Sequence, residues 1–380
     1  MKIADRIVVL GDDESAVMVA NKIVQRAKKG DVEVIIIGKN KRVEFTDSNP
    51  FIPVSLIDQS SSIRSMESIL RMSVQFLKDE PVTINLKDNT INTKNGKLIR
   101  YDYLILTDYL FPDTTKIMGY NEDARSIETI QGALQLKEDL VNFKKGEIVI
   151  YHDATSKYSP VNTVNLAVNI STFFDSKGLS KDVKISCVFG GESPSGIEGM
   201  DTVIENTLKS LGIEIVKNFE LSAINVKNKE LQSKDGKTLK YDIPIIFSPS
   251  SYYPYVEKSS FPKADSGNIE VNIKDLTLKG FDNVYVIGFA GKNFTNYWKL
   301  NRTQADFISA RIANSVSGYP EPDIYSYTYD IVLVKGKESA SDLLVDMNGK
   351  VVEGRASRTD YLVGLYSQES FFGTYAMGFI

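Results

Sequence analysis

Apolar positions in the first forty residues follow two different periods. Residues 6–10 and 32–37 are continuous apolar runs, which is typical of buried strands. Between them, apolar residues recur at helical spacing from Ser15 to Lys28, and Gly30 marks the end of that helix. Two strands joined by a helix of this length favour a parallel pair, and so a doubly wound sheet.

The same alternation returns after a boundary near Pro112. It predicts a second strand–helix–strand unit at residues 147–151, 161–174 and 183–189. Each unit is followed by a hairpin and one more buried strand: 85–98 then 101–106, and 221–239 then 241–247. The two halves therefore share one architecture although their sequences differ.

A late strand at residues 283–288 precedes a helix at 298–316, and short strands follow Pro322. The fold class that we expect is α/β, with two Rossmann-like domains and a small C-terminal α+β segment. At 380 residues the chain suits two or three domains, and 42% apolar residues are enough for ordinary cores.

Charge and cysteine content narrow the function classes. Forty-five basic residues against 49 acidic ones give a net charge of −4 without a basic stripe, so we expect no nucleic-acid partner. Cys187 is the only cysteine, which excludes a dithiol pair within the chain. With charges at residues 2–6 and no apolar run of about 20 residues, we expect a cytoplasmic protein, attached at most to the inner face of the cell membrane.

The order of these elements, with the loop Phe51-Ile52-Pro53, resembles the two-dinucleotide-binding-domain flavoproteins. Within that family the chain is most similar to sulfide:quinone oxidoreductases, with flavocytochrome c sulfide dehydrogenases and type II NADH dehydrogenases as relatives. The resemblance implies electron transfer from sulfide or NADH through FAD to quinone. It also implies three regions, which are an FAD-type domain at 1–112 plus 250–320, an NAD(P)-type domain at 113–249, and a segment at 321–380 that meets a membrane or another protein.

The motifs that would hold FAD depart from the family pattern. The first turn reads Gly11-Asp12-Asp13-Glu14-Ser15-Ala16, so Asp13 stands where a glycine lets the backbone approach the diphosphate. The family positions for FAD are Gly11, Asp13, Ala16, Thr107, Gly288 and Phe289. At these positions Asp108 follows Thr107 in place of a glycine, and Phe289 replaces the acid that would hold the ribityl chain.

Three acids on one turn oppose a diphosphate. One carboxylate about 4 Å from a phosphate repels it by roughly 4 kcal/mol at an effective dielectric constant near 20. The interpretation that we favour is that Asp12, Asp13 and Glu14 cap the helix in a fold that has lost its cofactor. A flavin bound by a rearranged loop stays open as the alternative, as does a site for Ca²⁺ or Mg²⁺.

The second turn and the cysteine also lack the family's chemistry. Residues 152–157 contain no glycine, so the phosphate cradle for NADH is missing. Cys187 lies mid-strand, and no cysteine occurs near residues 126–128 or 158–160, where the family's redox cysteines would stand. We interpret Cys187 as structural, His152 as incidental and the glycine-rich loop 190–196 as a surface connection.

The sequence therefore predicts a paralogue without catalytic residues and without a cofactor, acting as a structural or regulatory partner in a redox complex. An atypical FAD-dependent oxidoreductase that reduces quinone or another acceptor is the alternative, and a small-ligand binder is a weaker one. The aromatic-rich tail at 361–380 suggests a contact with another subunit, with a second copy of the chain, or with a membrane surface.

Overall fold

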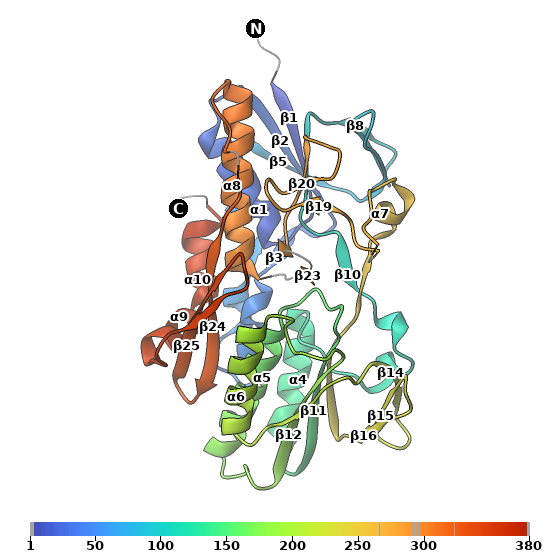
Figure 1. Ribbon diagram of the computed structural model, residues 1–380, viewed down its shortest axis with the longest axis vertical. Coiled ribbons are helices and arrows are strands. Elements are labelled where there is room, and N and C mark those ends of the chain that lie inside the picture. Colours follow the sequence, from blue (N-terminus) through green and yellow to red (C-terminus); the bar gives the residue numbers. More distant parts are fainter. Residues whose placement is uncertain (1–3, 266, 291–292, 295–296, 323, 378–380) are drawn as a thin grey trace.

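The computed structural model describes residues 4–265, 267–290, 293–294, 297–322 and 324–377. Two sheets, one mixed with a parallel core and one wholly parallel, lie at opposite ends of an elongated molecule, and the C-terminal elements lie along one side (Figure 1). This architecture confirms the expected α/β class and both strand–helix–strand units.

The larger sheet carries the N-terminal unit. Its strands, in spatial order, are β19 (Val271–Asn272), β20 (Thr277–Leu278), β21 (Val284–Val286), β9 (Tyr103–Leu106), β1 (Asp5–Leu10), β2 (Val32–Gly38) and β5 (Val74–Lys78). Strand β1 pairs in parallel with β2 on one side and β9 on the other. The chain therefore reverses its direction of travel across the sheet at β1, where open α/β sheets bind ligands at the carboxyl ends of the strands.

Two helices cover one face of this sheet. They are α1 (Glu14–Arg26) and α8 (Trp298–Ser317), which lie side by side in Figure 1. Helix α1 is buried from Glu14 to Ile23, while Arg26 in its last turn reaches Asp306 of α8. The apolar face of α1 packs on β1 and β2, and α8 packs against α1 and β24.

The second sheet repeats the plan with four strands. Its order is β13 (Glu214–Val216), β12 (Val183–Phe189), β11 (Gly146–His152) and β17 (Ile243–Phe247), all parallel. Its helices are α4 (Ile130–Asn142), α5 (Pro160–Ser176) and α6 (Glu198–Ser210). Helices α4 and α6 were not predicted from the sequence.

Each parallel sheet has a small antiparallel companion at the predicted hairpin. These are β6 (Pro81–Asn85), β7 (Thr90–Thr93) and β8 (Leu98–Arg100) in the first half, and β14 (Leu221–Asn225), β15 (Glu230–Ser233) and β16 (Thr238–Lys240) in the second. A short ladder, β10 (Leu110–Pro112) with β18 (Ser250–Tyr252), links the two halves. The shared architecture that the sequence indicated is therefore present.

The C-terminal region forms one more antiparallel sheet, covered by a helix. Its strands are β24 (Thr328–Gly336), β25 (Ser339–Asp346) and β26 (Val351–Glu353), and α9 (Arg358–Leu365) packs on β24 and β25. The chain then passes through α10 (Ser367–Ser370) and a turn of π-helix at Phe371–Tyr375. Phe371 and Phe372 are buried against Phe45, so much of the aromatic tail packs within the chain itself.

Candidate functional site

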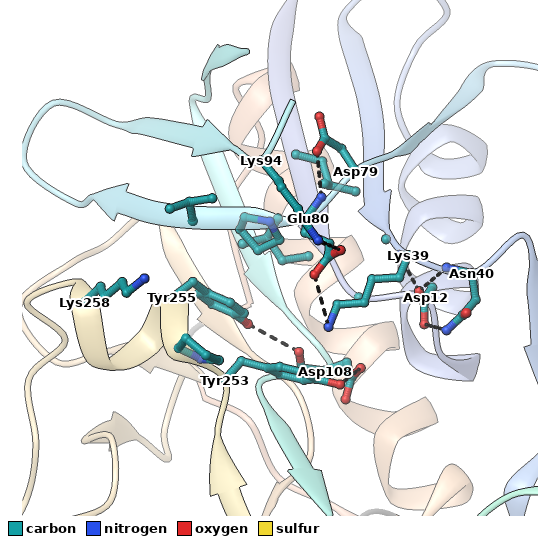
Figure 2. A pocket seen from close by; sticks show the side chains of 17 residues that line it. Asp12, Lys39, Asn40, Asp79, Glu80, Lys94, Asp108, Tyr253, Tyr255 and Lys258 are labelled. Carbon is teal, nitrogen blue, oxygen red and sulfur yellow. Dashed lines mark hydrogen bonds and ion pairs between the residues drawn. The ribbon is translucent and has the colours of Figure 1, made fainter. Parts of the chain in front are cut away.

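A cavity of about 410 Å³ opens at the carboxyl ends of β1 and β2 (Figure 2). It lies between the first strand–helix turn, the start of the hairpin after β5, and the short helix α7 (Pro254–Lys258). Apolar side chains and prolines form part of its wall, and charged groups reach it from several elements. Its lining includes Leu10, Gly11, Asp12, Ile37, Lys39, Asn40, Pro81, Val82, Lys94, Asp108, Tyr253 and Tyr255.

Gly11 closes the first turn tightly against the turn after β9. Its φ of +145° is rarely adopted by other residues, and a Cβ placed there would lie 2.1 Å from the Thr107 hydroxyl oxygen. The Thr107 hydroxyl lies 2.7 Å from Oδ1 of Asp13 and 3.2 Å from the Leu10 carbonyl. The sequence-predicted residues Gly11, Asp13 and Thr107 therefore come together at one point.

The three acids of the first turn point in three directions. Asp12 turns towards the end of β2, where one of its carboxylate oxygens accepts hydrogen bonds from the backbone N–H groups of Lys39 (2.6 Å) and Asn40 (2.7 Å). Asp13 caps helix α1, and its Oδ1 accepts from the Ala16 N–H at 3.0 Å. Glu14 is buried and faces Thr46, whose N–H lies 3.1 Å away.

These environments change the charge on the turn. Burial, followed by repulsion from Asp108, raises the pKa of Asp13 to about 6. Burial, followed by repulsion from Asp13 and Asp47, raises the pKa of Glu14 to about 8. Burial is also the main cause that raises the pKa of Asp12. Glu14 is therefore mostly uncharged at neutral pH, and only Asp13 keeps a carboxylate at the start of α1.

An ion pair joins the two halves of the molecule next to this turn. The Lys157 ammonium, from the second strand–helix turn, lies 3.0 Å from a carboxylate oxygen of Asp108 and 3.1 Å from the Leu110 carbonyl oxygen. Both charged side chains are largely covered, at 16% and 20% exposed. A separate void of only about 20 Å³ lies beside this ion pair, lined by Thr107, Lys157 and Gly288 among others.

The second strand–helix turn has different chemistry. Asp153 folds back on its own turn, where Oδ1 accepts from the N–H of Thr155 at 2.8 Å. His152 is buried, its Nδ1 is 2.9 Å from the Thr163 hydroxyl, and burial lowers its pKa to about 4. Its ring borders a second cavity of about 420 Å³ that is lined by serine hydroxyls, among them Ser156, Ser195 and Ser250.

The remaining sequence-predicted residues occupy structural positions. Ala16 is buried in the core beneath the first turn. Gly288 has a φ of +91°, and its N–H donates to Oε1 of Gln304 at 2.7 Å. Phe289 begins the short strand β22 (Phe289–Ala290), and its side chain lies outside the described residues. Cys187 is buried in β12 with its pKa raised by burial, which agrees with a structural role.

Sequence reasoning missed two features of the site. Asp12 contacts the end of β2, where the usual ribose-binding acid of this fold is replaced by Lys39, and that replacement was the available signal. Tyr253 was also missed, although its ring lies 4.5 Å from the Lys39 ammonium and borders the cavity. Among the residues that the structure describes, no three acidic, histidine or cysteine side chains gather as a metal site would require.

Comparison with known proteins finds similar chains among the quinone oxidoreductases. No model of a protein family matches the chain. It is 21% identical over 338 residues to the mitochondrial sulfide:quinone oxidoreductase of Dictyostelium discoideum, covering 84% of this chain and 73% of that one. The mouse enzyme of the same name is 24% identical over 308 residues, covering 74% of this chain and 64% of that one.

Solved structures place the fold in the same group. The sulfide:quinone oxidoreductase of Aquifex aeolicus superposes with a TM-score of 0.81 at 16% identity, covering 99% of this chain and 92% of that one. The chain has the fold of the two-dinucleotide-domain flavoproteins, and its sequence is similar to members of that family. A structure of the Tetrahymena thermophila mitochondrial ATP synthase contains a chain that matches this flavoprotein-family fold with a TM-score of 0.83 at 15% identity, covering 100% of this chain and 97% of that one.

The expectation of no cofactor is wrong. The relatives are quinone oxidoreductases of the family whose resemblance implied FAD, and they point to FAD as the cofactor. That expectation assumed that three carboxylates would repel the diphosphate. In the structure, the side chains of Asp12 and Glu14 turn away from the start of α1, and Glu14 is mostly neutral at pH 7. Helix capping is confirmed for Asp13 alone.

The residues of this site fit one half of an FAD molecule but not the other. The adenosine half fits, because the cavity offers apolar walls at Ile37 and Val82 and a carboxylate at Asp12. The diphosphate does not fit in this conformation, because the Ala16 N–H at the start of α1, which a phosphate would use, already donates a hydrogen bond to the Asp13 carboxylate.

Proposed function

We propose that this chain is an atypical FAD-dependent oxidoreductase that passes electrons to a quinone. The observation that carries this proposal is the cavity at the carboxyl ends of β1 and β2, since that is where doubly wound sheets bind dinucleotides. Bound FAD would supply a two-electron carrier between a donor and the quinone.

Different residues of the cavity would contact the base, the ribose and the phosphates of the cofactor's adenosine half. Ile37 and Val82 would pack against the base, and the Asp12 carboxylate would accept hydrogen bonds from the ribose hydroxyls. Lys39, whose ammonium lies between Glu80 and the Tyr253 ring, would offer positive charge to the phosphates. All four residues line the cavity, and Figure 2 labels Asp12 and Lys39 among them.

The electron donor differs from the donors of the relatives. The second turn has Asp153 and Thr155 in place of a glycine cradle, which disfavours NADH. Sulfide oxidation through a pair of cysteines is excluded by the single buried Cys187. The segments near Glu128 and Tyr158, where such cysteines would stand, do meet, because the Tyr158 hydroxyl donates to the Glu128 carbonyl at 3.0 Å.

Electron transfer to the quinone can be tested without knowing the natural electron donor, because dithionite can reduce the flavin in its place. The protein is purified, loaded with FAD and freed of excess FAD, and any bound flavin is reduced with dithionite without oxygen. Decylubiquinone is then added, and flavin absorption is followed. Reoxidation at a rate well above that of free reduced FAD supports the proposal. Absence of bound flavin after loading, or reoxidation no faster than in solution, contradicts it.

A second candidate is a subunit role in a larger assembly. It rests on the likeness to a chain of the Tetrahymena thermophila ATP synthase structure. Near the C-terminus, Leu362, Val363 and Tyr366 stay 40%, 49% and 48% exposed, which offers an apolar patch to another protein or to a membrane surface. Among the described residues, no helix is both long enough and apolar enough to cross a bilayer.

Isolation of the tagged chain from its own cells under mild conditions tests this role. Recovery of the same partner chains in constant ratio supports a subunit. A chain that runs alone on size exclusion and reduces quinone at full rate contradicts that role and favours the enzyme.

A further inference from the structure

The Asp13 carboxylate is linked through its neighbours to two cavities of the candidate site. Its neighbour Asp12 lines the cavity of about 410 Å³, and its hydrogen-bond partner Thr107 lines the void of about 20 Å³. A dinucleotide that runs from the larger cavity along the start of α1 would lie beside Asp13, which caps that helix. The diphosphate lies at the middle of such a ligand, where it meets the start of α1.

Asp13 already makes the contact that a phosphate would make there. Its Oδ1 accepts from the Ala16 N–H at the start of α1, at 3.0 Å, and from the Thr107 hydroxyl at 2.7 Å. An anionic oxygen at a helix N-terminus is stabilised by the free N–H groups and by the helix dipole. A phosphate oxygen and this carboxylate cannot both occupy the position.

We propose that Asp13 is a built-in competitor of the flavin diphosphate and sets the affinity of this chain for FAD. This inference rests on the proposed function and adds its regulation. Flavin enters when Asp13 rotates off the helix cap or takes up a proton. Affinity for FAD is therefore lower than that of a family member with glycine here, and it rises as the pH falls.

Other charged groups around Asp13 act on the same equilibrium. Asp108, after β9, repels its carboxylate, and Lys157 from the second turn attracts it. Glu14 follows it on α1 but, with its pKa raised to about 8, stays mostly protonated up to about pH 7.5 and adds little charge; the buried phenols of Tyr109 and Tyr255 also face Asp13. With its pKa near 6, Asp13 itself changes charge between about pH 5 and about pH 7.5.

Two substitutions on one turn isolate the effect. Asp13→Asn removes the charge and keeps a side chain that caps helices well, so the fold is preserved. Glu14→Gln is the matched control, since Glu14 is on the same turn but faces Thr46. Each apoprotein is titrated with FAD at about pH 5 and about pH 7.5, and quenching of flavin fluorescence gives the Kd. Circular dichroism and thermal denaturation check that all three proteins are folded.

The expected result is a pH-dependent difference confined to Asp13. At the higher pH, Asp13→Asn binds FAD at least about tenfold more tightly than the natural protein, because one close charge repulsion is removed. At the lower pH the two converge, and Glu14→Gln follows the natural protein throughout. Equal affinity and equal pH dependence for the natural protein and Asp13→Asn would overturn the inference and leave FAD binding standing. Failure of all three folded proteins to bind FAD at either pH would overturn the proposed function, and the inference with it.

Discussion

The two strand–helix turns of this molecule have the same architecture but different chemistry. The first keeps Gly11, because the backbone after β1 presses on Thr107, and a nucleoside-sized cavity lies beside it. The second has no glycine, uses Asp153 to fold its own turn, and borders a cavity lined with hydroxyl groups. A turn keeps its glycine where the backbone is crowded, and loses it where side chains take over the hydrogen bonds.

The difference between the turns is tested most strongly at Gly11. Gly11→Ala brings a Cβ to 2.1 Å from the Thr107 hydroxyl at a φ of +145°, and we expect a loss of about 3 kcal/mol or more in the free energy of unfolding. Gly30→Ala is the control, because it also has positive φ but no atom near the added Cβ, and about 1 kcal/mol is expected. Urea denaturation measures both, and equal losses would show that Gly11 is not crowded.

The ion pair between the halves comes next. Asp108→Asn leaves the Lys157 ammonium largely covered without its counter-charge, and we expect a cost of about 2 kcal/mol. Lys184→Met removes a pair with Glu147 in which Lys184 is 80% exposed, and a cost under about 0.5 kcal/mol is expected. Similar costs for the two variants would mean that Asp108 and Lys157 do not hold the two turns together.

The charge on the first turn has a smaller effect that depends on pH. The pKa of Glu14 is raised to about 8 in the folded protein, so folding favours its protonated form, and stability falls as the pH rises from about 4.5 to about 8. Glu14→Gln removes this loss. We expect it to stabilise the protein by at least about 1 kcal/mol near pH 8, and by little near pH 4. A pH-independent effect of this substitution would show that Glu14 does not change its proton occupancy on folding.

We expect no change of charge at His152, in the second turn, over the same pH range. Burial lowers the pKa of His152 to about 4, so its ring stays neutral. Because it is the only histidine, its ring signals in an NMR spectrum are unambiguous. They should stay constant from about pH 5.5 to about pH 8. A titration near the ordinary histidine value would show that the second cavity admits water and charge to His152.

The sequence was sufficient for most of the fold. Period and glycine placement predicted β1, α1, β2 and their counterparts in the second half, because those patterns reflect which face each element buries. Helix α6 was missed, since its short apolar face follows a loop rich in glycine and serine.

The site could be predicted only in part. The resemblance to the flavoprotein family placed Asp13 and Thr107 at the cofactor position, yet the sequence did not indicate that Asp12 turns to Lys39 or that Glu14 is mostly neutral. Side-chain direction and proton occupancy depend on contacts between distant segments, such as the pairing of Asp108 with Lys157. A pattern read along the chain does not contain these contacts, and so the cofactor prediction was wrong.

The decisive measurement is a structure of the protein loaded with FAD. We expect the adenosine in the cavity between Asp12 and Val82, with the Asp13 side chain displaced from the Ala16 N–H by the diphosphate. FAD density in the hydroxyl-lined cavity beside His152, or a diphosphate at the start of α1 with Asp13 still capping the helix, would contradict this expectation.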